Sequence, residues 1–341
     1  METKDFFFEI PPEQIAQEPS ARREDARLML LDRRTGERTV SRVSDLADLV
    51  APGTLIVTNN TLVEKKRLEG LRPGGGVVEL LLLRRLPSKE WQVMVGGPGR
   101  FRPGLALTLP EGRRATLREP EGRHWRVSLE PEIDSGYLER NGSVPLPPYI
   151  RRQPNRLDES RYQTVYAEKP GSAAAPTAGL HFTLELLGRL RNAGCEVASV
   201  TLHVGIDTFA PIRAERVEDH EMHGEWYEIS EETAEAVNRA KAEGRPVLAV
   251  GTTTVRTLEA AARVSTGRPV SPGSATTDLY IYPGFEFRVV DSMFTNFHTP
   301  GSSLVVMVSA FAGQEAIREA YQDAIDRGFR FFSYGDAMLI R

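Results

Sequence analysis

The feature that most constrains the fold is a change in sequence pattern between residues 63 and 149. In this block, short apolar runs rich in β-branched or aromatic residues are separated by Gly and Pro turns, as in VVELLLL from Val77, WQVMV from Trp91, LALTL from Leu105 and HWRVSL from His124. Such runs are typical of strands in a small antiparallel barrel. Connections rich in Pro and Gly, at 72–76 and 142–150, favour a domain boundary. We therefore expect a β-barrel-like domain over residues 63–149.

On either side of this block, strand patterns alternate with helical ones. Helical spacing of apolar residues predicts helices over 184–192, 231–243, 254–263 and about 303–327. Buried strands are predicted in EVASVTLHV from Glu196, PVLAVG from Pro246, DLYIY from Asp278, FRVVD from Phe287 and FRFFSY from Phe329. The N-terminal strands, 28–32 and 54–60, have no core of their own, so we expect them to complete the same sheet. The prediction is an α/β main domain with a mixed sheet, formed by residues 1–62 and 150–341, with the β domain inserted.

Composition excludes several classes of protein. The longest stretch without a charged residue, Ser292–Gln314, contains Asn296, His298 and Pro300, so it is not a transmembrane helix. The N-terminus carries acidic residues where a signal peptide needs a basic segment, so we expect a cytoplasmic protein. Cys195 is the only cysteine, which excludes an intramolecular disulfide and a thiolate metal cage.

The net charge of −4 conceals a strong asymmetry along the chain. Between Lys65 and Arg126 there are 14 Lys and Arg against six Glu, a balance of +8, so the remainder sums to −12. A second basic patch, Arg151 to Arg161, lies among tyrosines. Arg113, Arg114 and Arg118 taken singly fit a solvated surface, but the regional bias predicts a face for a polyanion.

The segment PVLAVGTTTVRTLE, residues 246–259, is the first candidate for a ligand site. A buried strand runs into Gly251 and three threonines just before a helix, and Thr252 and Thr253 would form the cradle for a ligand. Backbone N–H groups and hydroxyls at such a turn favour an anionic group, although a threonine there is also an ordinary helix cap. Arg256, one turn later, could bind a ligand or form a local ion pair.

The histidines form the second candidate, because five of the six follow residue 180. His220 and His223 belong to HEMH, which lacks the four-residue spacing of the HExxH zinc signature. A metal would need a third ligand, such as Glu225, and we expect no metal. His181, His203 and His298 stand beside Gly, Thr or Pro at the ends of predicted elements, where ligand-facing residues gather.

Carboxylates that could partner these histidines are Asp278 in TTDLY and Asp336 in SYGDAML. Either aspartate could instead cap or turn the chain. The residues alone therefore indicate an α/β enzyme with a basic β insertion and a histidine-rich site for an anionic or polar ligand.

Several long motifs occur in a fixed order, among them DFFFEIPPEQIAQEP, VPLPPYIRR, RYQTVYAEKPGSAAAPTAGLHFT, EDHEMHGEWYEIS, AVGTTTVRTLE, DSMFTNFHTPGSS and FFSYGDAMLI. Together they closely resemble the S-adenosylmethionine:tRNA ribosyltransferase-isomerase family of queuosine biosynthesis. The resemblance runs from about residue 5 to residue 340 and is weakest in the β block.

The resemblance implies that the ribosyl part of S-adenosylmethionine moves to the aminomethyl group of 7-aminomethyl-7-deazaguanine at the tRNA wobble position. Adenine and methionine leave, and the product is epoxyqueuosine-tRNA. The sulfonium acidifies the C5′ protons, so the reaction needs a base, and an acid would assist adenine departure. We expect these roles to fall within one pool, with base and acid unassigned: His181, His220, His223, His298, Asp278 and Asp336.

The resemblance also implies binding residues. Gly251, Thr252, Thr253 and Arg256 would hold the methionine carboxylate or a ribose hydroxyl, and Phe182, Phe209 and Phe297 offer faces for base stacking. The tRNA would contact Lys65, Lys66, Arg67, Arg151 and Arg152. We expect no cofactor beyond S-adenosylmethionine as co-substrate, no membrane partner, and a monomer.

The chain departs from the family pattern at four positions. Asn60, Leu62, Asp207 and Gly301 stand where the family usually has Asp, Arg, Gly and Lys. Three alternatives therefore stay open: a diverged S-adenosylmethionine-using transferase with a small-molecule acceptor, a tRNA-binding accessory protein without catalysis, and a metallohydrolase built on HEMH.

Overall fold

One mixed sheet forms the centre of the main domain. The structure, a computed structural model, describes residues 1–205, 208 and 210–341, and nine described strands form this sheet in the order β15-β13-β12-β3-β14-β16-β17-β1-β2. Its central strands are parallel and comprise β12 (Glu196–Leu202), β3 (Leu55–Asn59), β14 (Val247–Val250) and β16 (Ser292–Asn296). The flanking strands are β15 (Gly273–Thr277), β13 (Glu225–Ile229), β17 (Ala337–Ile340), β1 (Arg27–Leu31) and β2 (Arg38–Arg42). The predicted α/β domain is confirmed.

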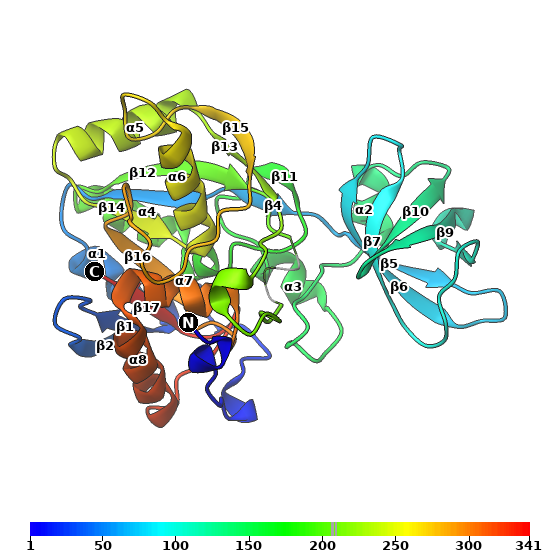
Figure 1. Cartoon of the computed structure of the whole chain (residues 1–341), viewed down its shortest axis with the longest axis horizontal. Coiled ribbons are helices and arrows are strands. Elements are labelled where there is room, and N and C mark those ends of the chain that lie inside the picture. Colours follow the sequence, from blue (N-terminus) through cyan, green and yellow to red (C-terminus); the bar gives the residue numbers. More distant parts are fainter. Residues whose placement is uncertain (206–207, 209) are drawn as a thin grey trace.

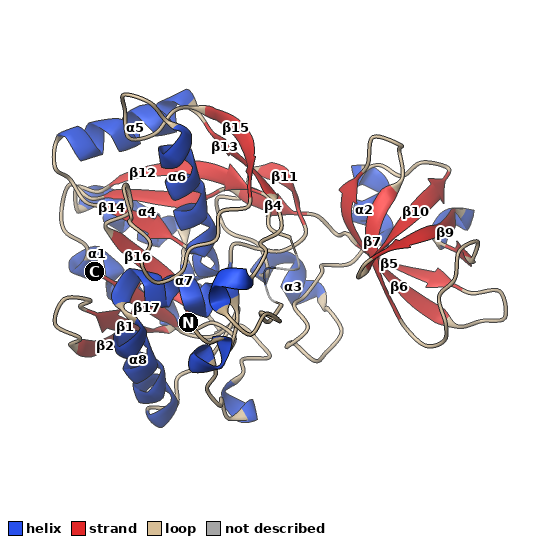
Figure 2. Ribbon diagram, viewed as in Figure 1, coloured by secondary structure: helices blue, strands red, loops and turns tan. Residues whose placement is uncertain are grey.

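Helices cover both faces of this sheet (Figure 2). One core joins the sheet to α5 (Glu231–Ala242), α6 (Thr252–Val264), α7 (Ser303–Ala312) and α8 (Gln314–Asp326). On the opposite face, α1 (Leu46–Leu49) and α4 (Leu184–Asn192) cover a second core. Because β3 and β14 are buried on both faces, β14 is wholly apolar and β3 begins with the apolar run LIV. No helix in the described part of the chain is long and apolar enough to cross a membrane.

The basic block folds as a closed antiparallel barrel that projects to one side of the main domain (Figure 1). Its strands are β5 (Arg67–Leu71), β6 (Val77–Arg85), β7 (Trp91–Gly96), β8 (Ala106–Thr108), β9 (Arg114–Glu121) and β10 (His124–Glu130). They enclose a core of their own, and α2 (Ser135–Asn141) follows β10 and packs on it. The barrel lies within the predicted block and confirms the β insertion.

The chain leaves and re-enters the main domain side by side. The outgoing strand β4 (Thr61–Val63) pairs in parallel with β11 (Lys169–Ser172) on the return path. Between them the returning chain forms α3 (Arg156–Arg161). This pairing fixes both ends of the insertion at the same place on the main domain.

Three predicted strands and one predicted helix differ from the structure. Residues 278–282 and 287–291 form loops, although Ile281, Val289 and Val290 are buried in the core that α6 shares with the sheet. FRFFSY is also a loop: Phe332 has a φ of +72°, which a strand cannot accommodate, and β17 follows it. The helix predicted over 303–327 is divided into α7 and α8 at Gly313, whose φ is +93°.

A glycine at the barrel junction provides a test of this packing. A Cβ added at Gly142, just after α2, would clash with the backbone carbonyl groups of Lys65 and Leu138. We therefore expect Gly142→Ala to destabilise the protein by roughly 2 kcal/mol or more in urea unfolding. The matched control is Gly188→Ala, because a Cβ there meets nothing within 4 Å inside α4. It should stabilise the protein by about 0.5–1 kcal/mol, and equal effects of the two changes would contradict the junction packing.

Candidate active site

The carboxyl ends of four parallel strands meet at one edge of the sheet. The chain runs from β3 to β12 on one side, and β14 later pairs with the other side of β3. Ligands of open α/β sheets bind at such a reversal of strand order, beyond the carboxyl ends. The residues at or just beyond these strand ends include Asn59, His203, Gly251 and His298. Sequence analysis had singled out three of them, and the sheet brings them together.

Asn59 ties this edge together. Its side-chain amide donates to the carbonyl oxygen of Leu202 at 3.0 Å and to Oγ1 of Thr253 at 3.2 Å. Its carbonyl oxygen accepts from the backbone N–H groups of Thr61 and Leu202, both at 3.1 Å. One fully buried side chain therefore joins β3, β12 and the start of α6. Sequence analysis missed Asn59, although a polar residue directly after the buried run LIVT was a signal for it.

The turn after β14 opens α6 as the sequence predicts. Gly251 precedes the helix with a φ of +89°, which only glycine adopts without strain. Thr252 and Thr253 line a small recess together with Asn296 and His298 from the end of β16. Both threonines thus face the carboxyl edge. Their binding of a carboxylate or a ribose hydroxyl stays a prediction.

Two histidines at this edge are buried and held by neutral partners. Nε2 of His298 lies 2.7 Å from Oγ1 of Thr295, and Nε2 of His181 accepts from Nδ2 of Asn296 at 3.2 Å. Burial lowers the pKa of His298 to about 3 and that of His181 to about 4. Both imidazoles are therefore neutral at neutral pH and can accept a hydrogen bond there.

A buried ion pair joins β13 to α6. Oε2 of Glu225 pairs with the guanidinium of Arg256, and both side chains are almost fully buried. Burial alone would raise the pKa of Glu225, but the charge of Arg256 and the hydrogen bonds from His223 and Gly205 outweigh it and hold that pKa below its ordinary value. Arg256 also donates to the carbonyl oxygens of Leu279 and Thr277. The guanidinium of Arg256 is thus bonded within the protein. This matches the local ion pair that sequence analysis offered as the alternative to ligand binding.

The second oxygen of Glu225 organises the loop before β13. Oε1 accepts from the backbone N–H of Gly205 at 2.9 Å and from the Thr208 hydroxyl at 3.0 Å, and it lies 3.3 Å from Nε2 of His223. A carboxylate in this position fixes the orientation of the imidazole. His223 therefore has one ring nitrogen held by Glu225 and a side chain that is partly exposed.

Beside this loop, a cavity of about 660 Å³ lies between the barrel and the main sheet. The barrel contributes Trp91 and His124, and the sheet contributes His203, His223 and Trp226. The His203 ring stacks on Trp226 with 4.8 Å between centroids and 24° between planes. A volume of this size suits a cofactor-sized ligand. Sequence analysis missed Trp226, whose only signal was its place next to Glu225.

A second cavity of about 440 Å³ shares His124 and His223 with the first and is also lined by His220. HEMH forms an extended loop after a 3-10 turn at Val217–Asp219 and is not helical. The His220 ring packs edge-on against Tyr280. The pKa of His220 is lowered, mainly by burial. In the described part of the chain, no three His, Cys, Asp or Glu side chains gather as metal ligands. Glu225, the nearby candidate for the third ligand that a metal would need, is paired with Arg256.

Several expected site residues lie away from these cavities. The Asp336 carboxylate is buried and accepts from the backbone N–H groups of Arg27 and Arg330, both at 2.8 Å. Phe182 and Phe297 are fully buried in the two cores on opposite faces of the sheet. Asp278 follows β15 at the surface. Phe209 and Asp207 lie outside the described residues.

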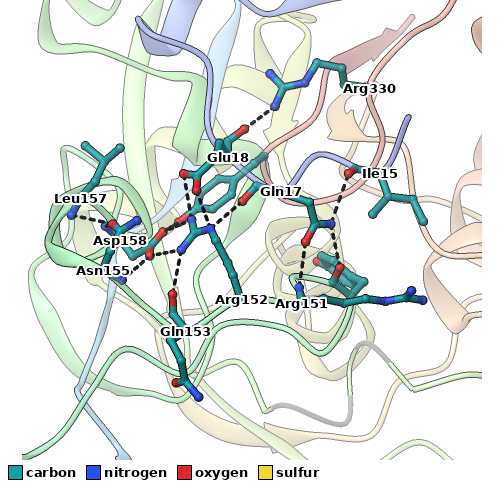
Figure 3. A network of polar contacts seen from close by, with 12 residues as sticks. Ile15, Gln17, Glu18, Arg151, Arg152, Gln153, Asn155, Leu157, Asp158 and Arg330 are labelled. Atoms are coloured by element: carbon teal, nitrogen blue, oxygen red, sulfur yellow. Dashed lines mark hydrogen bonds and ion pairs between the residues drawn. The ribbon is translucent and has the colours of Figure 1, made fainter. Parts of the chain in front are cut away.

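Four of the five cations expected to contact tRNA form ion pairs within the protein. Lys65 pairs with Glu139 and Glu159, Lys66 with Glu64, Arg67 with Glu79, and Arg152 with Asp158 and Glu18. Figure 3 shows Arg152 at the centre of this last network. Arg151 is bonded there through its backbone N–H to Gln17, and its own side chain is exposed.

Two of the departures from the family pattern have a local structural explanation. Asn60 is buried; its amide donates to Glu168 at 3.1 Å and its carbonyl oxygen accepts from the Thr201 hydroxyl at 2.7 Å. Gly301 has a φ of +63°, and a Cβ there would clash with the ring of Phe7. A lysine at position 301 would therefore require Phe7 to move. The Leu62 side chain is half-buried on β4.

The chain is similar to the proteins of one family over nearly its whole length. The family model described as "Queuosine biosynthesis protein" matches residues 3–340. Curated proteins named S-adenosylmethionine:tRNA ribosyltransferase-isomerase are 49% identical over 344 residues in Geobacter metallireducens and 50% over 345 residues in Syntrophotalea carbinolica, with 100% of both chains covered in each case. The crystal structure of S-adenosylmethionine tRNA ribosyltransferase from Thermotoga maritima matches with a TM-score of 0.57 and 33% identity, covering 99% of this chain and 100% of that one.

The Glu225–Arg256 pair gives a prediction with a defined pH dependence. Arg256→Met leaves a buried carboxylate without its cation and should cost about 3–5 kcal/mol in urea unfolding at pH 7. Because the folded-state pKa of Glu225 lies below its ordinary value of 4.5, the pair stabilises the fold above that pH and loses this contribution as the pH falls further. The difference between wild type and Arg256→Met should therefore shrink in acid.

The control for this prediction is the double change Glu225→Gln with Arg256→Met. It removes both charges and should recover part of the lost stability. A double variant as unstable as the single one at pH 7 would show that the loss comes from packing and not from the unpaired charge.

Proposed function

Because the chain belongs to the family of queuosine biosynthesis proteins, we propose that it is an S-adenosylmethionine:tRNA ribosyltransferase-isomerase. It transfers and isomerises the ribosyl group of S-adenosylmethionine on a tRNA, which yields epoxyqueuosine. The observation that carries this conclusion is 49% identity to such an enzyme across the whole of both chains. The proposed acceptor is 7-aminomethyl-7-deazaguanine at the wobble position, with adenine and methionine as the leaving products.

The 660 Å³ cavity is the proposed place of reaction. It adjoins the carboxyl edge of the sheet through Val204, which lines both this cavity and the recess beside Thr252 and Thr253. The stacked pair of His203 and Trp226 offers an aromatic face for adenine or the deazaguanine. A base extruded from the anticodon loop would enter between the barrel and the sheet.

His223 is the proposed base that removes the C5′ proton next to the sulfonium. It lines the cavity, and Glu225 lies 3.3 Å from its Nε2. If Nε2 donates to that carboxylate, Nδ1 carries a lone pair and can accept a proton. The carboxylate would also stabilise the imidazolium that forms. Glu225 is in this scheme a positioning residue, held in turn by Arg256.

The decisive experiment measures adenine release from S-adenosylmethionine in the presence of tRNA bearing 7-aminomethyl-7-deazaguanine. We expect adenine in step with modified tRNA, and a loss of turnover of at least about 100-fold in His223→Gln, the size of a general-base contribution. Glu221→Gln, an exposed change in the same segment, is the matched control and should retain turnover.

The outcomes of that experiment separate the alternatives. Adenine release with the free deazapurine base and no tRNA would favour a small-molecule acceptor. Binding of tRNA without adenine release would favour an accessory protein. Full turnover in His223→Gln would remove this histidine from the base role and leave the reaction itself unaffected.

The two neighbouring arginines of the second basic patch should behave differently. Arg151→Gln removes an exposed cation, so tRNA binding should weaken and the slope of log K against log salt should fall by roughly 1. Arg152→Gln leaves the buried Asp158 carboxylate without its cation, so it should lower stability by about 2 kcal/mol or more. Salt titrations and urea unfolding measure the two effects, and an unchanged salt slope in Arg151→Gln would exclude it from the RNA path.

A further inference from the structure

Two arginines line a small recess next to His181, and a third, Arg330, is bonded to a serine of its wall. Arg23 and Arg161 line the recess with His181, Ser20 and Tyr334. Arg330 donates to the Ser20 hydroxyl at 3.1 Å and to the backbone oxygen of Glu18, as Figure 3 shows for the second bond. We call this place the arginine recess.

The arginine recess is unusual because its cations lack carboxylate partners. Arg23 donates to the backbone oxygens of Leu180, Ser160 and Gln163, each at 2.8 Å. Arg161 donates to the backbone oxygens of Ser20 and Ala21. Among the described residues, none of the three arginine side chains forms an ion pair with a carboxylate, in contrast to Lys65, Arg67 and Arg152 of the basic regions.

The carboxylates of the surrounding network are already engaged. Asp158 accepts from the Tyr334 hydroxyl at 2.7 Å and also pairs with Arg152. Asp336 lies within reach of the Arg27 side chain and accepts from the backbone N–H of Arg330. The arginine recess therefore keeps an excess of positive charge.

Two further observations indicate that this charge is unsatisfied. Nε of Arg161 is buried and has no hydrogen-bond partner among the described residues. Burial, followed by the charge of Arg161, lowers the pKa of Arg23 to about 10. Like charges held together without a counter-ion destabilise a fold, so such a cluster is a candidate for ligand binding.

The arginine recess adjoins the candidate active site. His181, which lines the recess, is bonded through Nε2 to Asn296, and Asn296 lines the recess beside Thr252 and Thr253. The hydrogen-bonded pair of His181 and Asn296 thus separates the arginine recess from the recess beside Thr252 and Thr253. After burial, the charges of Arg23, Arg330 and Arg161 are further causes that lower the pKa of His181, so their field reaches this pair.

We propose that the arginine recess binds a single oxyanion group of a substrate. The planar guanidinium fork matches the paired oxygens of a phosphate or a carboxylate. The inference rests on the proposed function, which supplies two sources of this chemistry: a backbone phosphate of the tRNA and the carboxylate of S-adenosylmethionine. In both cases the anion neutralises the cluster and places the substrate against the carboxyl edge of the sheet.

The experiment compares Arg330→Gln and Arg161→Lys with the control Arg22→Gln. Arg22 is exposed and pairs with Glu24, whereas Arg330 is bonded to Ser20 of the recess, so the control removes the same charge nearby. Equilibrium dialysis measures the Kd of S-adenosylmethionine, and a filter assay at fixed ionic strength measures the Kd of tRNA. We expect both recess variants to raise one of these Kd values about tenfold or more, as loss of a charge-assisted hydrogen bond does. Arg161→Lys keeps the charge and loses only the fork.

If only the Kd of tRNA rises, the bound oxyanion is a tRNA phosphate. If only the Kd of S-adenosylmethionine rises, it is the carboxylate of that substrate. Sodium sulfate should compete with that same substrate in the wild type more strongly than sodium chloride of equal ionic strength. Unchanged Kd values in both folded variants, or a shift no larger than that of Arg22→Gln, would overturn the proposal. Because both assays measure binding, a wild type that releases no adenine would contradict the proposed function and leave this test intact.

Discussion

The parallel alignment of β12, β3, β14 and β16 is the constraint on which the rest of the site depends. Parallel strands end at the same edge, so residues far apart in the chain, Asn59, His203, Gly251 and His298, come together there. Asn59 holds the central strands in place through hydrogen bonds to Leu202, Thr61 and Thr253. The order of the strands in the sheet therefore decides which polar groups lie together in one site.

The buried Glu225–Arg256 pair links this edge to the cavity beside the barrel. Each of two opposite charges in an apolar interior offsets the desolvation cost of the other. Either charge alone would carry an uncompensated desolvation penalty. The remaining oxygen of Glu225 is then available to bind Gly205 and Thr208 and to orient His223. A pair that stabilises the join between β13 and α6 thus also sets the position of a side chain that faces the cavity.

The partner of each Lys or Arg side chain in the folded protein decides whether its charge is neutralised or left available. Lys65, Lys66, Arg67 and Arg152 belong to basic segments, yet each is bound to a carboxylate of the folded chain. The arginine recess shows the opposite arrangement, since its three side chains have only neutral partners in the described part of the chain. Net charge along a sequence cannot separate these cases, because it does not show which cations the folded chain pairs with an acid, whether near in sequence, as Glu64 is to Lys66, or distant, as Glu159 is to Lys65.

The sequence by itself determined the inserted barrel, the α/β domain and most of their elements, because hydrophobic periodicity and turn residues act locally. Helix α4 and strand β14 lie where the periodicity predicts them. Residues 278–282 and FRFFSY were wrongly predicted as strands, since burial of an apolar run does not require a strand partner. Gly251, Thr252, His203 and His298 were identifiable because they come directly or shortly after apolar strands. Only the tertiary structure decided that Arg256 pairs with Glu225, that Phe182 and Phe297 belong to the core, and that Asn59 and Trp226 stand in the site. These facts depend on contacts between segments far apart in the chain, which no local pattern encodes.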